Sequence, residues 1–281
     1  MDFVLSEDNI KKIYFISGLP RSGNTLLSSI LSQNPNIGST GQSCIPDIFY
    51  SINQVEKNSA RFLSWNDNNS LNNIYKNIFS NYYSNWKQDY IIERSDWIIP
   101  NNYEILKNHC PNEIKIVILV RDVLEIIRSF VKLGRSHPRL FLNQDAGVMF
   151  NIDFKDVNDE QRIQTLMHED GYVWTILKSI ERIIRHKFPN VLFVEYDDLV
   201  SNTEKTIEQI YKFYNIPLFQ HTYTNLKQLS VNSVKYDDYV YGGPLHEIHT
   251  EGIKKNHNPV VLPEHVVKKY SNLEIWRNNI P

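Results

Sequence analysis

The chain has 281 residues, of which 41% are hydrophobic and 12% aromatic, and its formal net charge is −2. A chain of this length and composition can bury a sizeable core, so we expect a single α/β domain over residues 1–281. The near-neutral charge argues against general nucleic-acid binding, and we expect no nucleic-acid partner.

Signals of secretion and of membrane insertion are weak in this sequence. Its two cysteines, Cys44 and Cys110, are far apart in the chain and predict free thiols in a reducing compartment. Residues 1–12 lack a basic segment followed by an apolar run, and no stretch reaches the roughly 18 apolar residues of a membrane span. We therefore expect a soluble, cytoplasmic protein with no membrane span.

The first half of the chain alternates short apolar segments with helical patterns. Residues 12–17 (KIYFIS) predict a buried strand, residues 25–33 a helix, and residues 37–41 a short second strand. Within the polar residues 51–89, apolar side chains from Leu71 to Tyr82 at helical spacing predict a peripheral helix. What this insertion does is not indicated by its sequence, although it could shape an acceptor pocket.

The middle of the chain contains the strongest strand. Residues 90–93 predict one strand, and residues 114–120 (IKIVILV) predict another whose nearly continuous apolar run is typical of a parallel strand covered on both faces. A helix is expected at residues 123–133. Residues 134–160 are predicted to be irregular, as a mobile lid or an acceptor-specific insertion.

The last third begins with a predicted long helix over residues 160–188, followed by a strand at residues 191–196. A further helix is expected after Ser201 or Asn202, and a short one near residues 263–270. The strand–helix alternation predicts an α/β protein of three layers, in which a central, mostly parallel sheet has helices on both faces.

The loop at residues 18–25 (GLPRSGNT) carries the clearest chemical signal. Gly18 and Gly23 allow backbone conformations that turn N–H groups inward, and the following helix start adds free amides, so the loop can cradle an anion. Ser22 and Thr25 can add hydroxyl donors, and Arg21 adds a fixed positive charge.

The spacing of this loop is P-loop-like, but one residue separates it from the nucleoside-triphosphate motif. Asn24 stands where that motif has the Lys that reaches the terminal phosphates. Asp122 could hold Mg²⁺ at a strand end, but Arg121 precedes it and suits an anionic ligand better. A nucleotide or small-molecule kinase is therefore an alternative that the sequence disfavours.

Three motifs in this order resemble the PAPS-dependent sulfotransferase family, and most of all its bacterial sulfotransferase-like members. Residues 20–25 (PRSGNT) resemble the loop that holds the 5′-phosphosulfate of PAPS, and Arg121 with Ser129 resembles the pair that grips the 3′-phosphate. Tyr196 stands where the family has a Tyr beside the adenine. Residues 246–250 (HEIHT) resemble a segment near the end of such proteins.

The resemblance implies that PAPS is the donor, adenosine 3′,5′-bisphosphate is the product, and no metal is needed. The donor-binding residues that it implies are Arg21, Ser22, Gly23, Asn24, Thr25, Arg121, Ser129, Tyr196 and Lys254. His246 and His249 stand at helical spacing but lack further ligands nearby, so a metal site there is not expected.

The catalytic residues implied by the resemblance are two cations and one base. Arg21 and Arg94 would neutralise the charge that grows on the leaving oxygen, Arg94 standing where relatives carry a catalytic Lys. Asp96 aligns with a family His and ranks first as the base that takes the acceptor's proton, with Glu93 and Asp47 as alternatives.

The identity of the acceptor is not indicated. Residues 40–46 (TGQSCIP) lack the carboxylate that protein-tyrosine sulfotransferases carry in the matching segment, which argues against tyrosine in proteins as the substrate. A hydroxyl or amine of a small molecule, carbohydrate, lipid or peptide remains open, as does a non-catalytic nucleotide-binding relative. The sequence gives no indication of the oligomeric state.

Overall fold

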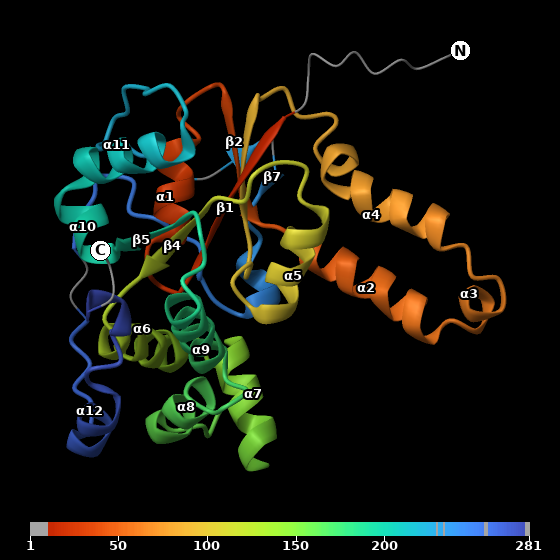
Figure 1. The fold of residues 1–281 in the computed structure, drawn as a ribbon. Coiled ribbons are helices and arrows are strands. Elements are labelled where there is room, and N and C mark those ends of the chain that lie inside the picture. The colour runs from red at the N-terminus through yellow and green to blue at the C-terminus, as the bar shows by residue number, and fades with distance from the viewer. Residues whose placement is uncertain (1–10, 229, 233, 256–257, 279–281) are drawn as a thin grey trace.

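Five parallel strands form the central sheet of the chain (Figure 1). The structure, a computed structural model, describes residues 11–278 except 229, 233, 256 and 257. The strands are β1 (Lys12–Gly18), β2 (Ile37–Gln42), β3 (Tyr90–Arg94), β4 (Ile116–Val120) and β5 (Val191–Glu195). They lie in the order β2-β3-β1-β4-β5. All five residues of β4 are buried, which explains the unbroken apolar sequence of that strand.

Strand β1 lies at the centre of the sheet, where Phe15 is paired with Glu93 of β3 on one side and Ile116 of β4 on the other. The chain leaves β1 toward β2 on one side and later crosses from β3 to β4 on the other side. The carboxyl end of β1 is therefore a topological switch point, where open α/β sheets bind their ligands.

Helices cover both faces of the sheet and bury a separate apolar core on each. One face packs against α1 (Asn24–Leu31), α10 (Tyr196–Ser201) and α11 (Thr203–Tyr214). The other packs against α2 (Ile45–Asn58), α4 (Asn68–Tyr82), α5 (Pro100–His109), α6 (Val123–Ser136) and α9 (Tyr172–Arg185). Successive β1 residues point to opposite cores: Ile16 points to the core beneath α1 and α11, and Phe15 points to the core on the other face. The predicted three-layer α/β fold is confirmed.

Residues 134–160 are more regular than their sequence predicts. They contain α7 (Phe141–Phe150), which packs against α8 (Asp159–Leu166). The buried face of α7 includes a polar residue, Asn143, whose amide donates to the carbonyl of Gly134 at 2.9 Å and accepts from Arg162 at 2.7 Å. Because a polar side chain stands at a buried position, the apolar periodicity that marks a helix is broken.

The single long helix expected over residues 160–188 is wrong, since α8 and α9 are two helices separated by a turn. Gly171 precedes α9, and a Cβ there would lie 2.4 Å from the carbonyl oxygen of Thr165. The apolar spacing continues across this break, which is why periodicity alone did not reveal it.

Helices α2, α3 (Ala60–Ser64) and α4 form an arm that projects from the sheet, with α3 at its far end (Figure 1). Of these, only α4 was predicted. The chain ends with the short strands β6 (Ser230–Val231) and β7 (Val234–Lys235), then η2 (Asp238–Tyr241), α12 (Glu264–Tyr270) and η3 (Ile275–Asn278). Within the described part of the chain, no helix is both long and apolar enough to cross a membrane.

Candidate active site

The loop between β1 and α1 is shaped by two glycines with positive φ. Gly18 has φ of 133°, and a Cβ there would lie 2.1 Å from the carbonyl oxygen of Leu119, so the loop must pass close to β4. Gly23 has φ of 90° and precedes α1 without a side-chain cap. The first amides of α1 therefore lack partners within the helix and are open to an anion.

Two polar residues of this loop bind the loop itself. The Ser22 hydroxyl, which is fully buried, donates to the carbonyl of Leu19 at 2.5 Å, and the Asn24 amide donates to the same carbonyl at 2.9 Å. Asn24 lines the neighbouring pocket and Ser22 does not. Asn24, which stands where the triphosphate-binding motif has its Lys, therefore forms a hydrogen bond within the loop.

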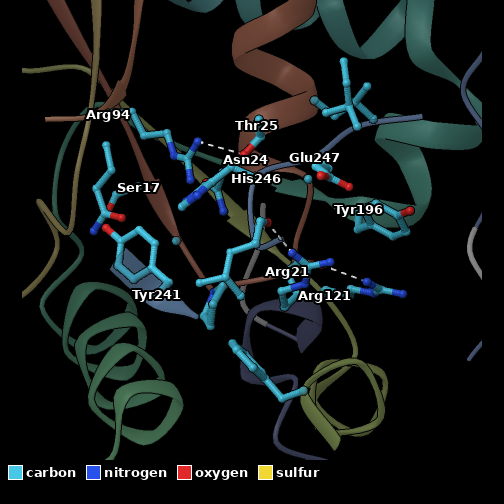
Figure 2. A pocket seen from close by; sticks show the side chains of 18 of the residues that line it. Ser17, Arg21, Asn24, Thr25, Arg94, Arg121, Tyr196, Tyr241, His246 and Glu247 are labelled. Carbon is cyan, nitrogen blue, oxygen red and sulfur yellow. Dashed lines mark hydrogen bonds between the residues drawn. The ribbon is translucent and has the colours of Figure 1, made fainter. Parts of the chain in front are cut away.

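A pocket opens at the carboxyl edge of the sheet (Figure 2), and it is lined at or just after the end of each strand. The residues at or just after the five strand ends are Gln42, Arg94, Gly18, Arg121 and Tyr196. Residues 241–254, which begin at the last residue of η2 and lie outside the sheet, supply a further part of the lining, from Tyr241 to Lys254. Segments far apart in the chain thus meet at the switch point.

Arg21 and Arg121 form the cationic side of this pocket. The Arg21 side chain donates from Nε to the Ser129 hydroxyl at 3.1 Å and from Nη1 to the Leu245 carbonyl at 2.5 Å. Arg121 is buried and donates to the Arg21 carbonyl at 2.8 Å, and its guanidinium lies 4.2 Å from the centre of the Tyr196 ring. Burial, and the Arg121 charge after it, lower the pKa of Arg21.

Carboxylates do not neutralise this cluster fully. Arg121 has Glu125 at 3.7 Å, but no carboxylate of the described residues forms an ion pair with Arg21. Positive charge held near a second positive charge, in a half-buried site, favours binding of an anion.

Arg94 lies at the other side of the loop and joins three parts of the chain. Its Nη1 donates to the Thr25 hydroxyl at 3.0 Å and to the Tyr236 hydroxyl at 2.7 Å (Figure 2 shows the bond to Thr25). The end of β3, the start of α1 at Thr25 and the segment that contains Tyr236 are thereby held together around one cation.

The three carboxylates expected as bases have different environments. Asp96 lines the pocket and accepts a hydrogen bond of 3.1 Å from the Tyr172 hydroxyl, and burial raises its pKa although Tyr172 and Arg94 oppose this. Glu93 is fully buried in the core, where it accepts from the Trp97 indole, and Asp47 is exposed on α2. Neither of these two lines the pocket.

Two other residues that the sequence predicts to bind the donor lie at the border of this pocket. Ser129 contacts Arg21 from α6 without lining the pocket. Lys254 lines the pocket, is exposed, and pairs with Glu251 at 3.4 Å. The structure therefore gathers Arg21, Asn24, Thr25, Arg94, Asp96, Arg121, Tyr196 and Lys254 around one cavity, with Gly23 in its wall.

Sequence reasoning did not place His246 in the site as a titratable group. The ring is buried, lines the pocket, and bonds through Nδ1 to Asp238 at 2.5 Å. The segment that contains both residues has no periodicity, so no pattern could have paired them. The one available signal was the likeness of residues 246–250 to a segment of bacterial relatives.

Fold and pocket together define an α/β protein with a P-loop-like turn after β1, beside cations that suit a ligand with more than one anionic group. The profile described as "Sulfotransferase family" matches residues 14–221. The chain belongs to this family, and membership indicates an enzyme that transfers a sulfonate group.

One of the solved structures that resemble this chain supports the fold. The sulfotransferase domain of the Synechococcus PCC 7002 olefin synthase is 17% identical, with a TM-score of 0.54 over 98% of this chain and 99% of that one. A retinol dehydratase solved in complex with androsterone and the inactive cofactor PAP is 15% identical, with a TM-score of 0.47 over 95% and 80%. A search of curated proteins by sequence found no match.

Proposed function

We propose that this chain transfers the sulfonate group of PAPS to a hydroxyl or amine acceptor by in-line displacement, without a metal. The observation that carries the proposal is the contact between Arg21 and Arg121 beside the glycine-bounded loop. One phosphate can bind the loop and the start of α1, and a second anionic group can bind the nearby guanidinium of Arg121. Such a ligand is a nucleotide with phosphates at two separate positions, as adenosine 3′,5′-bisphosphate is.

The proposed donor site has an end for each part of PAPS. The loop residues Gly23 and Thr25, with Arg21, would hold the 5′-phosphosulfate, while Arg121 and Lys254 would hold the 3′-phosphate. The Tyr196 ring, which stacks against Arg121, offers a flat face for the adenine. Ser129 would orient Arg21, and Ser22 and Asn24 would hold the loop in shape.

Arg94 and Arg21 are the proposed catalytic cations. When the acceptor oxygen bonds to sulfur, the bond from sulfur to the bridging oxygen breaks and negative charge grows on the 5′-phosphate. Fixed guanidinium groups on both sides of the loop stabilise that charge more in the transition state than in the bound donor. Asp96, beside Tyr172 in the same pocket, is the carboxylate proposed for the acceptor end.

The acceptor end of the pocket is partly aromatic. Phe130, Phe141, Tyr172 and Tyr241 line it, and they suit a small molecule, although a carbohydrate or peptide with an accessible hydroxyl would meet the same groups. The geometry does not favour the alternative of a kinase, because Asn24 is engaged with the loop. A cytoplasmic location stays a prediction.

Titration calorimetry with adenosine 3′,5′-bisphosphate tests the donor site directly. We expect binding at submillimolar or lower ligand concentration, without added Mg²⁺. Adenosine 5′-monophosphate is the control, since it lacks the 3′-phosphate that Arg121 would bind. Its affinity should be lower by roughly tenfold or more. No binding of the bisphosphate, or turnover of Mg²⁺–ATP, would contradict the proposal.

A further inference from the structure

His246 is fixed by a single carboxylate that it contacts twice. Its backbone N–H donates to Oδ2 of Asp238 at 2.8 Å, and its ring Nδ1 lies 2.5 Å from Oδ1 of the same residue. Among the described residues, nothing hydrogen-bonds to the other ring nitrogen, Nε2. A carboxylate at Nδ1 keeps the proton on that nitrogen, which leaves the lone pair of Nε2 free in a residue that lines the pocket.

The imidazole is also connected to both proposed catalytic cations. The Tyr236 ring stacks on it at 4.1 Å between centres with an angle of 6°, and the Tyr236 hydroxyl accepts from Arg94 at 2.7 Å. On the other side, Arg21 donates to the carbonyl of Leu245, the residue before His246. The position of the ring is thereby coupled to the two groups that would hold the reacting end of the donor (Figure 2).

The surroundings of the ring keep it neutral. Burial lowers the pKa of His246, and the charges of Arg94 and Arg21 lower it further, while Asp238 opposes them. Tyr236 and Tyr241 also face the ring, at 4.1 and 5.6 Å between ring centres. A neutral imidazole that donates from Nδ1 can accept a proton at Nε2.

We propose that His246, held by Asp238, takes the proton of the acceptor hydroxyl, a role that rests on the proposed sulfonate transfer. As the acceptor oxygen bonds to sulfur, its O–H bond breaks and the proton moves to Nε2. The bond from sulfur to the bridging oxygen breaks in the same step, and its electron pair leaves with adenosine 3′,5′-bisphosphate. The imidazolium then returns the proton to solvent. Asp238 and Tyr236 are positioning residues.

A neutral ring suits this place better than the carboxylate of Asp96. The donor brings a negatively charged sulfonate into the pocket, and an ionised carboxylate beside it would be repelled, whereas an uncharged imidazole is not. Asp96 also already accepts a hydrogen bond from the Tyr172 hydroxyl. His246 and Asp238 lie outside residues 14–221, so the part of the chain that matches the family does not contain them.

The tautomer of His246 is the first test, and it needs no acceptor. ¹⁵N NMR of the full chain with bound adenosine 3′,5′-bisphosphate should show His246 protonated at Nδ1 and not at Nε2 at neutral pH, with the signal assigned by its loss in His246→Gln. In Asp238→Asn the amide must donate to Nδ1 while its oxygen keeps the backbone bond, so the proton should move to Nε2. Asp237→Asn is the matched control, because this neighbour accepts a hydrogen bond from the backbone N–H of Tyr239 and should leave the tautomer unchanged.

The second test compares phenol with 4-nitrophenol as acceptors, measuring adenosine 3′,5′-bisphosphate formed from PAPS. 4-Nitrophenol is largely ionised at mildly alkaline pH and needs no base. His246→Gln should slow transfer to phenol by about 10²- to 10⁴-fold and transfer to 4-nitrophenol by less than about tenfold. Asp238→Asn should show the same pattern. If neither phenol is an acceptor, the rate of bisphosphate release with water as the acceptor is measured instead. The tautomer of His246 then decides whether the proposal stands.

Several results would overturn the proposal. His246 carrying its proton on Nε2 in the wild type excludes it as the base, as does an equal loss with both phenols in His246→Gln. A selective loss with phenol in Asp96→Asn, absent from His246→Gln, would assign the role to Asp96. Failure of the bisphosphate to bind would instead remove the proposed function, whatever the tautomer of His246.

Discussion

Arg121 donates a hydrogen bond of 2.8 Å to the main-chain carbonyl of Arg21, so the cation that follows β4 holds the loop that follows β1. Arg21 has φ of 60°, in the left-handed region that a non-glycine residue rarely adopts. The bond from Arg121 helps to hold this conformation. We therefore expect the Arg121 guanidinium to do two things: to hold the loop in shape and to bind the 3′-phosphate of the proposed ligand.

Arg121→Ala should weaken binding of adenosine 3′,5′-bisphosphate by about 10- to 100-fold, because a charged hydrogen bond to the ligand and the support of Arg21 are both lost. Arg121→Lys should recover part of the affinity, since it keeps the charge but not the planar contact with Tyr196. Calorimetry measures both, and Arg185→Ala, an exposed cation on α9, serves as the control. Equal affinity in Arg121→Ala and the wild type would remove Arg121 from the site.

Arg94→Ala should lower the rate of transfer by about 10²- to 10³-fold, while affinity for the bisphosphate changes by less than about tenfold. The reason is that Arg94 touches Thr25 at the phosphosulfate end, where charge develops only during the reaction. Initial rates with PAPS and phenol, together with calorimetry, separate the two quantities. Thr25→Ser, which retains a hydroxyl for Arg94, is the matched control, and an unchanged rate in Arg94→Ala would show that the cation is not catalytic.

Glu93→Gln should stabilise the protein at high pH. Burial raises the pKa of Glu93 from 4.5 to about 7, against the lowering effects of Ser43, Trp97 and Tyr83. The folded state then holds this proton more tightly than the unfolded state, so the wild type loses stability as pH rises from 4.5 to about 7. Above that range the loss amounts to about 3 kcal/mol.

Thermal or urea unfolding across this pH range checks the expectation. The free energy of unfolding of Glu93→Gln should fall less with pH than that of the wild type, whereas Glu169→Gln, an exposed loop residue, should follow the wild type. Parallel curves for Glu93→Gln and the wild type would mean that Glu93 has the same pKa in the folded and unfolded states.

Gly18→Ala should destabilise the fold by at least about 2 kcal/mol and abolish measurable binding of the bisphosphate. A methyl group at this position would meet the carbonyl oxygen of Leu119 at 2.1 Å, and φ of 133° is strained for any residue with a side chain. The loop would have to move away from β4, carrying its amides with it. Denaturant unfolding and calorimetry test this, and normal stability with normal binding would show that the loop adapts.

Much of the scaffold could be predicted because its signals are local. The apolar runs of β1 and β4 and the glycines at 18 and 23 mark strands and a P-loop-like turn without knowledge of the fold. The predictions that missed an element or joined two elements into one also went wrong for local reasons. Helix α7 was missed because Asn143, a polar residue, occupies a buried position, where Gly134 and Arg162 satisfy its amide. The helices α8 and α9 were joined because the apolar spacing continues across the break at Gly171.

By itself, the sequence predicted the five strands of the sheet, the glycine-bounded loop after β1 that contains Arg21, and the places of Arg94 and Arg121 at strand ends, since these depend on neighbours in the chain. Tertiary structure alone decided which groups meet across the pocket. It buried Glu93 away from the cavity, set Tyr172 against Asp96, and brought Asp238 and His246 beside the cations. Such contacts join residues up to 224 positions apart, as between Arg21 and Leu245, and no local periodicity encodes them.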